Sequence, residues 1–311
     1  MTTSTRTTAR THRFALCLAL LLSFALPAFA QQDTWSGVER IVAVGDVHGD
    51  YEQFVKTLRA AEVMDKDNKW TAGKTHLVQT GDVFGRGPNS KKVLDLLLDL
   101  EAQAAKAGGM VHALLGNHEL MVLQGSYHYL DPRDVEAFGG QAELTKALAA
   151  DGKYGKWLRG HNAIVQINDT IFCHAGLTPR VSHMKLSEIN KAVVADLVKS
   201  ESGSLVLESD GPLWTRVYAD DDSAAERIDA VLKARGAGRM VVGHNVMSAG
   251  VTPLAGGKVI GIDVGMTGLI GGPAACLVID KGVLYEVGHE RPKRRLNVPA
   301  ASAPATVPAK A

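Results

Sequence analysis

Three stretches decide the fold of this chain: Gly45-Asp46-Val47-His48-Gly49, Gly81-Asp82-Val83-Phe84-Gly85-Arg86-Gly87 and Gly116-Asn117-His118-Glu119. Each stretch ends a short apolar run, at residues 41–44, 76–79 and 111–115. Such runs, ended by glycine, are typical of buried strands. Residues 51–63 and 89–107, which lie between the runs, show the apolar spacing of helices. The pattern therefore predicts a βαβαβ unit with a parallel sheet.

Polar side chains follow each of these three predicted strands. In a parallel sheet the ligand crevice lies outside the carboxyl ends of the strands, so the three motifs should converge on one rim. The residues brought together would be Asp46, His48, Asp82, Asn117 and His118. Carboxylate and amide oxygens with imidazoles form a donor set that suits divalent transition metals. The sequence therefore predicts a metal site at this rim.

The second half of the chain, from Asn162, is rich in short apolar runs. We expect strands at 163–167, 170–174, 239–243, 258–263, 274–279 and 283–287, and helices at 187–199 and 224–235. Two strand-rich halves with helices between them predict an α/β fold of two mixed sheets packed face to face and flanked by helices. This single domain would span residues 36–290. Residues 120–160, with short helical pieces broken by Asp131-Pro132 and Gly139-Gly140, would form a cap-like insertion.

The first 30 residues have the features of a secretory signal peptide. Arg6, Arg10 and Arg13 precede an apolar run at 14–26, and Ala28-Phe29-Ala30 provides a small-x-small cleavage site. An apolar run of 13 residues is too short to span a bilayer, so no transmembrane segment is expected in the mature form. We expect cleavage after Ala30 and export, to the periplasm.

Charge separates the body of the chain from its ends. The net charge is +1, and removal of the leader with its three Arg lowers it to −2. Residues 291–311 carry five basic residues and no acidic one, so the remaining body is at −7. An acidic body argues against nucleic acid as a partner. The Pro- and Ala-rich end, residues 291–311, is expected to be disordered. Cys173 and Cys276 lie in apolar runs and are expected to be buried free thiols.

Two further histidines follow predicted strands, in Phe172-Cys173-His174-Ala175-Gly176 and Val241-Val242-Gly243-His244-Asn245. The ordered set GDVHG, GDVFGRG, GNHE, HAG and GH resembles the calcineurin-like metallophosphoesterases, in particular the phosphoprotein phosphatase family. The strings GNHELMVLQGS, GKWLRGHNAIVQI, GPLWTR and VVGH…GIDVGM resemble its bacterial Shewanella-like subgroup. The resemblance covers roughly residues 41–287. It implies the metallophosphoesterase sandwich of two sheets.

The resemblance also implies roles for individual residues. Two divalent ions, manganese first with iron or zinc as alternatives, would be held by Asp46 and His48, by a bridging Asp82, and by Asn117, His174 and His244. A hydroxide bridging the two metals would attack the phosphorus, and His118 would protonate the leaving oxygen. Arg86 would bind the phosphoryl oxygens together with Asn117. Arg216 and Arg159 are candidates for further substrate contacts, and Asp263 and Tyr127 are weaker candidates.

One position departs from the family pattern. The resemblance implies Asp in the second motif, since relatives usually have it there to orient the general-acid histidine, but this chain has Gly85. The implied activity is hydrolysis of phosphomonoesters with protein-phosphatase-like specificity, toward phosphotyrosine or other phosphopeptides. A dinucleoside-polyphosphate or small-metabolite phosphohydrolase remains an alternative. A non-catalytic metal- or phosphate-binding protein, suggested by Gly85, is a second one.

Overall fold

The computed structural model describes residues 1, 32–197, 204 and 208–299. The chain divides into two units, Met1–Ala30 and Gln31–Ala311, and only the second is described below. Beyond Met1, the predicted signal peptide lies outside the described residues, as do residues 300–311 of the predicted tail.

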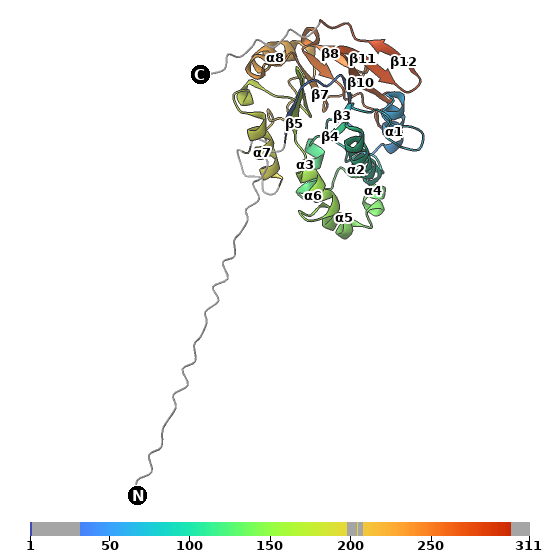
Figure 1. Ribbon diagram of the computed structural model, residues 1–311, viewed down its shortest axis with the longest axis vertical. Helices are drawn as coiled ribbons and strands as arrows, with labels where there is room; N and C mark the ends of the chain where they lie inside the picture. Colours follow the sequence, from blue (N-terminus) through green and yellow to red (C-terminus); the bar gives the residue numbers. More distant parts are fainter. Residues whose placement is uncertain (2–31, 198–203, 205–207, 300–311) are drawn as a thin grey trace. The chain divides into compact units, whose positions relative to one another are not determined.

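Two six-stranded mixed sheets form the centre of this unit (Figure 1). The first has the order β12-β11-β10-β2-β3-β4, in which β2, β3 and β4 are parallel. The second has the order β1-β5-β6-β7-β9-β8, in which β6, β7 and β9 are parallel. A single apolar core contains buried side chains from both sheets. These observations confirm the predicted α/β fold of two mixed sheets.

The strands have the following bounds: β1 Thr34–Trp35, β2 Arg40–Val44, β3 His76–Gln79, β4 Met110–Ala113, β5 Ile164–Ile167, β6 Thr170–Cys173, β7 Arg239–Val242, β8 Thr252–Leu254, β9 Val259–Gly261, β10 Ala275–Asp280, β11 Val283–Gly288 and β12 Arg291–Arg295. The predicted βαβαβ unit is β2-α1-β3-α2-β4. All four residues of β3 are buried, as are the last four of β2, because helices cover these strands and the second sheet packs nearby.

The helices have the following bounds: α1 Tyr51–Ala60, α2 Ser90–Ala107, α3 Asn117–Leu123, α4 Pro132–Ala137, α5 Gln141–Leu148, α6 Lys153–Arg159, α7 Leu186–Asp196 and α8 Asp221–Arg235. Helix α1 begins directly after the first motif, where the Asp50 side chain accepts a hydrogen bond from the Gln53 N–H at 3.1 Å. The short helices α3 to α6 fill the region predicted as an insertion, and Figure 1 shows them grouped beside α2.

The carboxyl end of the domain differs from the prediction. Residues 291–295 were expected to belong to a disordered tail, but they form strand β12, which pairs with β11. Buried Glu286 in β11 explains the difference, because it forms ion pairs with Arg291, at 3.0 Å, and with Arg294. The prediction is therefore wrong for these five residues.

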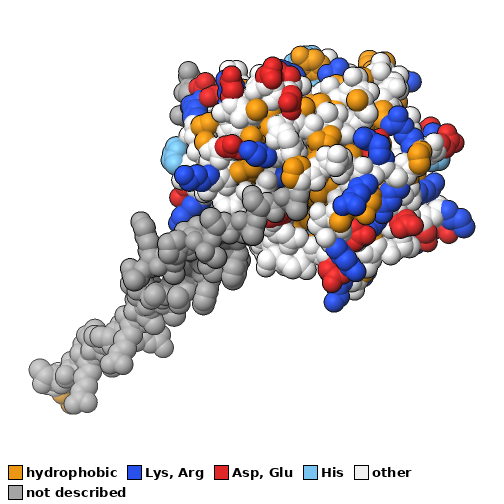
Figure 2. Space-filling model, turned by 90° about the horizontal axis from the view of Figure 1, so that it is seen from above, with side chains coloured by type: hydrophobic (Ala, Val, Ile, Leu, Met, Phe, Trp, Pro, Cys, Tyr) orange, Lys and Arg blue, Asp and Glu red, His pale blue; other side chains and the backbone are white. Residues whose placement is uncertain are grey.

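The described residues also bear on the thiols, on membrane crossing and on surface charge. Both Cys173 and Cys276 are buried free thiols, as predicted. None of the helices in the described ranges combines the length and the apolar character that crossing a membrane requires. Figure 2 shows that basic and acidic side chains both occur across one face of the molecule.

Candidate metal centre

The five sequence motifs follow the carboxyl ends of β2, β3, β4, β6 and β7. The parallel arrangement brings them together at one rim, as the strand pattern predicts. Close approach of the loops depends on a small residue: a Cβ added to Gly243 would lie 2.4 Å from Asp46 Oδ1. The backbone N–H of His244 donates to Asp46 Oδ1 at 3.0 Å, which joins the fifth motif to the first.

The imidazole of His174 is the centre of one group of donors. Its Nε2 lies 2.8 Å from Asn117 Oδ1, 3.1 Å from His244 Nδ1 and 3.4 Å from Asp82 Oδ1. His174 is fully buried, and the exposed fractions of the other three residues are 8 % or less. These four residues come from four different motifs, so only the folded chain assembles them.

The hydrogen bonds of the His174 and His244 rings show that neither ring has a proton on the nitrogen that faces this group. His174 Nδ1 lies 2.9 Å from the Thr80 carbonyl oxygen, and His244 Nε2 lies 3.3 Å from the Trp214 carbonyl oxygen. Each of these nitrogens must therefore carry the proton, and the other nitrogen of each ring presents a lone pair to the group. Two nitrogen lone pairs, an amide oxygen and a carboxylate oxygen then face one another without a proton among them. Such a set of acceptors fits a divalent cation.

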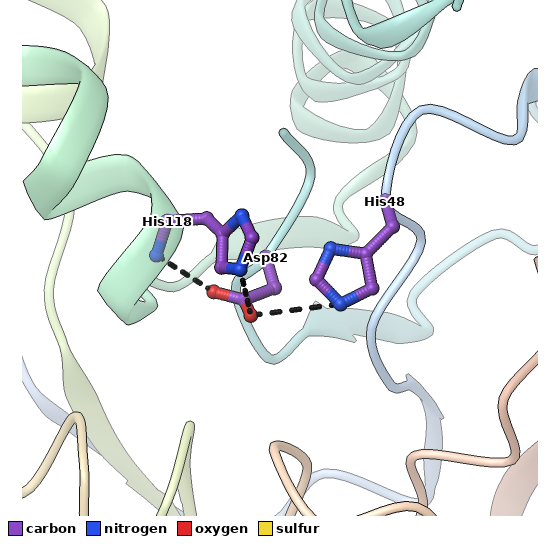
Figure 3. A group of neighbouring side chains, drawn as sticks. All are labelled: His48, Asp82 and His118. Atoms are coloured by element: carbon purple, nitrogen blue, oxygen red, sulfur yellow. Dashed lines mark hydrogen bonds and ion pairs between the residues drawn. The ribbon is translucent and has the colours of Figure 1, made fainter. Parts of the chain in front are cut away.

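A second group forms around the other oxygen of Asp82 (Figure 3). Asp82 Oδ2 lies 3.8 Å from His48 Nε2 and 3.8 Å from His118 Nε2, and His48 Nε2 is also 3.8 Å from Asp46 Oδ2. His48 Nδ1 lies 2.9 Å from the Phe84 carbonyl oxygen, which leaves the lone pair on Nε2, the nitrogen available to a metal ion. Asp82 thus belongs to both groups, as a bridging ligand would.

Several buried carboxylates lie close together at the site, and the protein supplies too little positive charge to offset their repulsion. Burial raises the pKa of Asp46, and the nearby carboxylates of Asp263 and Asp82 raise it further. Burial also raises the pKa of Asp82, together with the charge of Glu119. Burial lowers the pKa of His48 to about 4 and so keeps this ring neutral, the form that binds metal ions. Divalent cations would relieve the repulsion among the carboxylates.

The backbone of the site is strained. His48, Asp82, Arg86 and His244 all have positive φ, between 45° and 64°. This conformation costs a residue with a side chain about 1–2 kcal/mol. Strain of this kind persists only where the surrounding structure enforces it, and it is concentrated at functional sites.

Glu119 holds the strained backbone of the second motif in place. Its fully buried carboxylate accepts hydrogen bonds from the N–H groups of Asp82 at 2.7 Å, Val83 at 2.8 Å and Gly116 at 2.8 Å. The loops after β3 and β4 are thereby held together. Glu119 thus faces the interior of the protein and supports Asp82, a predicted metal ligand.

The three predicted arginines have different positions. Arg86 has an exposed side chain beside the site. Burial lowers the pKa of His118 to about 3, and the positive charge of Arg86 contributes to this shift. Arg216 reaches the fifth motif, because its Nη1 donates to Asn245 Oδ1 at 3.1 Å. Arg159 Nη1 donates to the carbonyl oxygens of residues 148 and 155, both at 2.9 Å, and so ties α5 to α6. A substrate contact of Arg159 stays a prediction.

Other residues at the site were weak candidates or were not predicted. Asp263 lies beside Asp46, and burial raises its pKa to about 6. Tyr129 was missed: its ring lies 5.3 Å from the ring of His118, and its carbonyl accepts the Arg86 N–H at 2.9 Å. No motif surrounds Tyr129 that could have marked it. The hydroxyl of Tyr127 lies 3.0 Å from Thr145 Oγ1, within the insertion.

Comparison with known proteins identifies the family. The family model described as calcineurin-like phosphoesterase matches residues 39–247. An uncharacterised protein of Schizosaccharomyces pombe is 32 % identical over 78 % of this chain and 77 % of its own length. Shewanella-like protein phosphatase 2 of Arabidopsis thaliana is 28 % identical over 74 % of this chain and 72 % of its own. The crystal structure of a cold-active protein-tyrosine phosphatase from a psychrophilic Shewanella species superposes with a TM-score of 0.80 at 31 % identity, covering 86 % of this chain and 84 % of the other. The family match, together with the shared fold, confirms the resemblance seen in the motifs: the chain belongs to the calcineurin-like phosphoesterase family.

Proposed function

We propose that this phosphoesterase hydrolyses phosphomonoesters with the help of two divalent metal ions. The observation that carries the proposal is the convergence of unprotonated acceptors from His174, His244, Asn117 and Asp82. A second group around His48 shares Asp82 with the first. We propose manganese as the metal, with iron or zinc as alternatives, because the donor types suit all three.

The metal ions, when bound, would supply an activated water molecule and neutralise charge on the phosphoryl group. The remaining roles fall to side chains of the chain. Arg86 and Arg216 carry the positive charge that attracts and orients the phosphoryl oxygens. His118, in the same group as His48 and Asp82, would give a proton to the leaving oxygen.

We propose a phosphoprotein, with phosphotyrosine as the first choice, as the substrate. The names of the similar proteins support this choice, since they include a protein-tyrosine phosphatase and a protein phosphatase. A small phosphorylated metabolite would use the same metal centre. Turnover of a phosphotyrosine peptide, compared with that of dinucleoside polyphosphates and sugar phosphates, distinguishes these substrates.

We also propose that the protein is exported to the periplasm. The support is the basic and apolar leader that ends at Ala28-Phe29-Ala30. Amino-terminal sequencing of the protein isolated from cells should find a mature chain that begins at Gln31. A chain in the cytoplasmic fraction that begins at Met1 would contradict this proposal.

The decisive experiment measures turnover and metal content on the same samples. With manganese added, the purified protein should hydrolyse p-nitrophenyl phosphate and bind two ions per chain. Asp82→Asn should lower turnover below detection and reduce metal content, because Asp82 belongs to both groups. Asp67→Asn, at an exposed carboxylate paired with Lys66, is the matched control and should behave as the wild type. Two bound metals without turnover would favour a non-catalytic binding protein.

The role of His118 needs a separate variant, because geometry places it in the same group as two ligands. His118→Asn should lower kcat about 100-fold or more, the usual contribution of a general acid. Metal content should stay at two ions per chain. A loss of one metal in this variant would make His118 a ligand.

A further inference from the structure

Exposed apolar side chains are unevenly distributed on this protein. Apart from Met1, the large apolar side chains that are exposed in the described part of the chain are Tyr129, Val246, Leu269 and Ile270. Single exposed apolar residues are ordinary on soluble proteins. Here, however, all four belong to loops that contact the metal centre. Leu269, with 75 % of its surface exposed, is the most prominent.

Three of the four lie in two loops that meet, and we call these three residues the apolar ledge: Val246, Leu269 and Ile270. Val246 Cγ1 and Ile270 Cγ2 lie 3.1 and 2.6 Å from the position of a Cβ on Gly265, so both side chains pack over the same glycine. Leu269 directly precedes Ile270 in the same loop. Val246 and Ile270 therefore meet although they lie in different loops, and Leu269 is the adjoining exposed apolar residue of the second loop.

The ledge borders the metal centre on two sides. Val246 follows the ligand His244 by two residues, and Asn245 between them accepts a hydrogen bond from Arg216. The loop that carries Leu269 and Ile270 is fixed to the start of α1, directly after the first motif, because the Gly268 N–H donates to Asp50 Oδ2 at 3.0 Å. Asp50 in turn follows the ligand His48 by two residues. A molecule whose phosphate reaches the metals would thus pass close to the ledge.

Tyr129 extends the apolar surface at another part of the site. Its ring, 50 % exposed, lies beside the ring of His118, and its backbone carbonyl holds the Arg86 N–H. The proposed phosphate-binding region therefore has positive charge from Arg86 and Arg216, and each arginine contacts a segment that carries an exposed apolar side chain. This combination suits a ligand with a dianionic phosphate and apolar groups near it.

We propose that the apolar ledge, together with Tyr129, binds apolar side chains adjacent to the phosphorylated residue of a peptide substrate. The proposal rests on the proposed phosphatase function and narrows its substrate class. A small polar phosphorylated metabolite has no apolar surface to place on the ledge, whereas Leu or Phe beside a phosphorylated residue would bury area that both partners otherwise expose to water.

The test compares two phosphotyrosine peptides that differ only at the residues flanking phosphotyrosine, Leu in one and Asp in the other. The wild type should show a kcat/KM about tenfold higher for the Leu peptide, the size expected from burying one large apolar side chain. The double variant Leu269→Ser/Ile270→Ser should reduce this ratio to about 1–2. Both substitutions are on exposed side chains, and the ratio is measured within one protein sample, so a change in folded fraction cancels.

Val283→Ser is the control. Val283 lies at the start of β11, paired with Asp280, and Asp280 pairs with Arg40 at the start of β2, so this position is at the end of the sheet opposite the site. The Leu-to-Asp peptide ratio of Val283→Ser should equal that of the wild type.

Equal rates on the two peptides, or a double variant that keeps the tenfold ratio, would overturn the inference. Hydrolysis of p-nitrophenyl phosphate without hydrolysis of either peptide would also overturn it, while the metal-dependent phosphatase activity would stand. Absence of hydrolysis of every phosphate ester in the presence of manganese would refute the proposed function itself.

Discussion

Gly85 gives the sharpest test of how His118 is held. A Cβ at this position would lie 2.4 Å from His118 Nδ1 and 2.8 Å from its Cε1, well inside van der Waals contact. The ring has little freedom to move away, because it packs 4.6 Å from the ring of His48 and 5.3 Å from the ring of Tyr129. Gly85→Ala should therefore displace the imidazole while leaving the six predicted metal ligands in place.

Two effects of different size follow from Gly85→Ala. Alanine at φ 94° costs about 1–2 kcal/mol of stability, because the left-handed region disfavours a Cβ. Displacement of His118, the proposed general acid, should lower kcat about 100-fold for a substrate with a poor leaving group, such as an alkyl phosphate. The loss should be smaller for p-nitrophenyl phosphate, since nitrophenolate leaves without being protonated. Metal content should not change.

Gly282→Ala separates the clash from the strain. Gly282 has φ 81°, but no atom lies within 4 Å of its added Cβ, so this variant carries the backbone cost alone. An alkyl phosphatase activity of Gly85→Ala within twofold of Gly282→Ala would refute the reasoning. Gly85→Asp, which introduces the residue that the family resemblance implies here, should lose as much activity as Gly85→Ala. A Gly85→Asp variant more active than the wild type would show that His118 can turn to meet a carboxylate.

Three further predictions concern the support of the site and of the core. Glu119→Gln replaces an acceptor oxygen by an amide N–H₂ that faces backbone N–H groups. This variant should lower the free energy of unfolding by about 1–3 kcal/mol, measured by urea unfolding, and should weaken metal binding, measured by metal titration. Burial lowers the pKa of His112 from 6.5 to about 3, so the unfolded state binds this proton more readily. The free energy of unfolding should therefore fall as the pH drops below 6.5 toward 3, by about 1.4 kcal/mol per pH unit from this group. Urea unfolding at pH 7 and pH 5 measures this pH dependence, which should be weaker in His112→Gln than in the wild type. The control variant His289→Gln should not weaken it. Removal of metal with a chelator should lower Tm, since metal at 100 times its Kd adds about 2.7 kcal/mol, and Asp82→Asn should show a smaller difference between the metal-loaded and chelated samples.

The strands that position the site could be predicted because each signal was local. β3 has the predicted bounds, and β2 begins one residue early, since an apolar run ended by glycine defines both strands. The site residues followed from the rule that the carboxyl ends of parallel strands meet. The separation of Asp46 and His244 by 198 positions did not matter, because both lie at such ends.

Features that depend on tertiary contacts could not be predicted in this way. β12 has the sequence Arg-Pro-Lys-Arg-Arg, which shows no apolar alternation, and it becomes a strand through pairing with β11 and ion pairs to Glu286. Arg159 and Arg216 each lie two residues after a Trp, yet Arg216 contacts the fifth motif whereas Arg159 binds carbonyl oxygens of α5 and α6. The two arginines differ in which carbonyl and amide oxygens surround them, and no local pattern specifies that environment.

The outermost position of β12 also bears on how copies of this protein behave when they are crowded together. An unpaired sheet margin can recruit a strand from another molecule and begin aggregation. Here that margin is a five-residue strand whose side chains are all exposed, with four cationic groups and Pro292, which has no N–H to offer. If β12 of a second copy were added here, the cationic groups of the two strands would repel each other, and Pro292 would interrupt the hydrogen bonds between them. This edge of the sheet should therefore resist fibril-like growth.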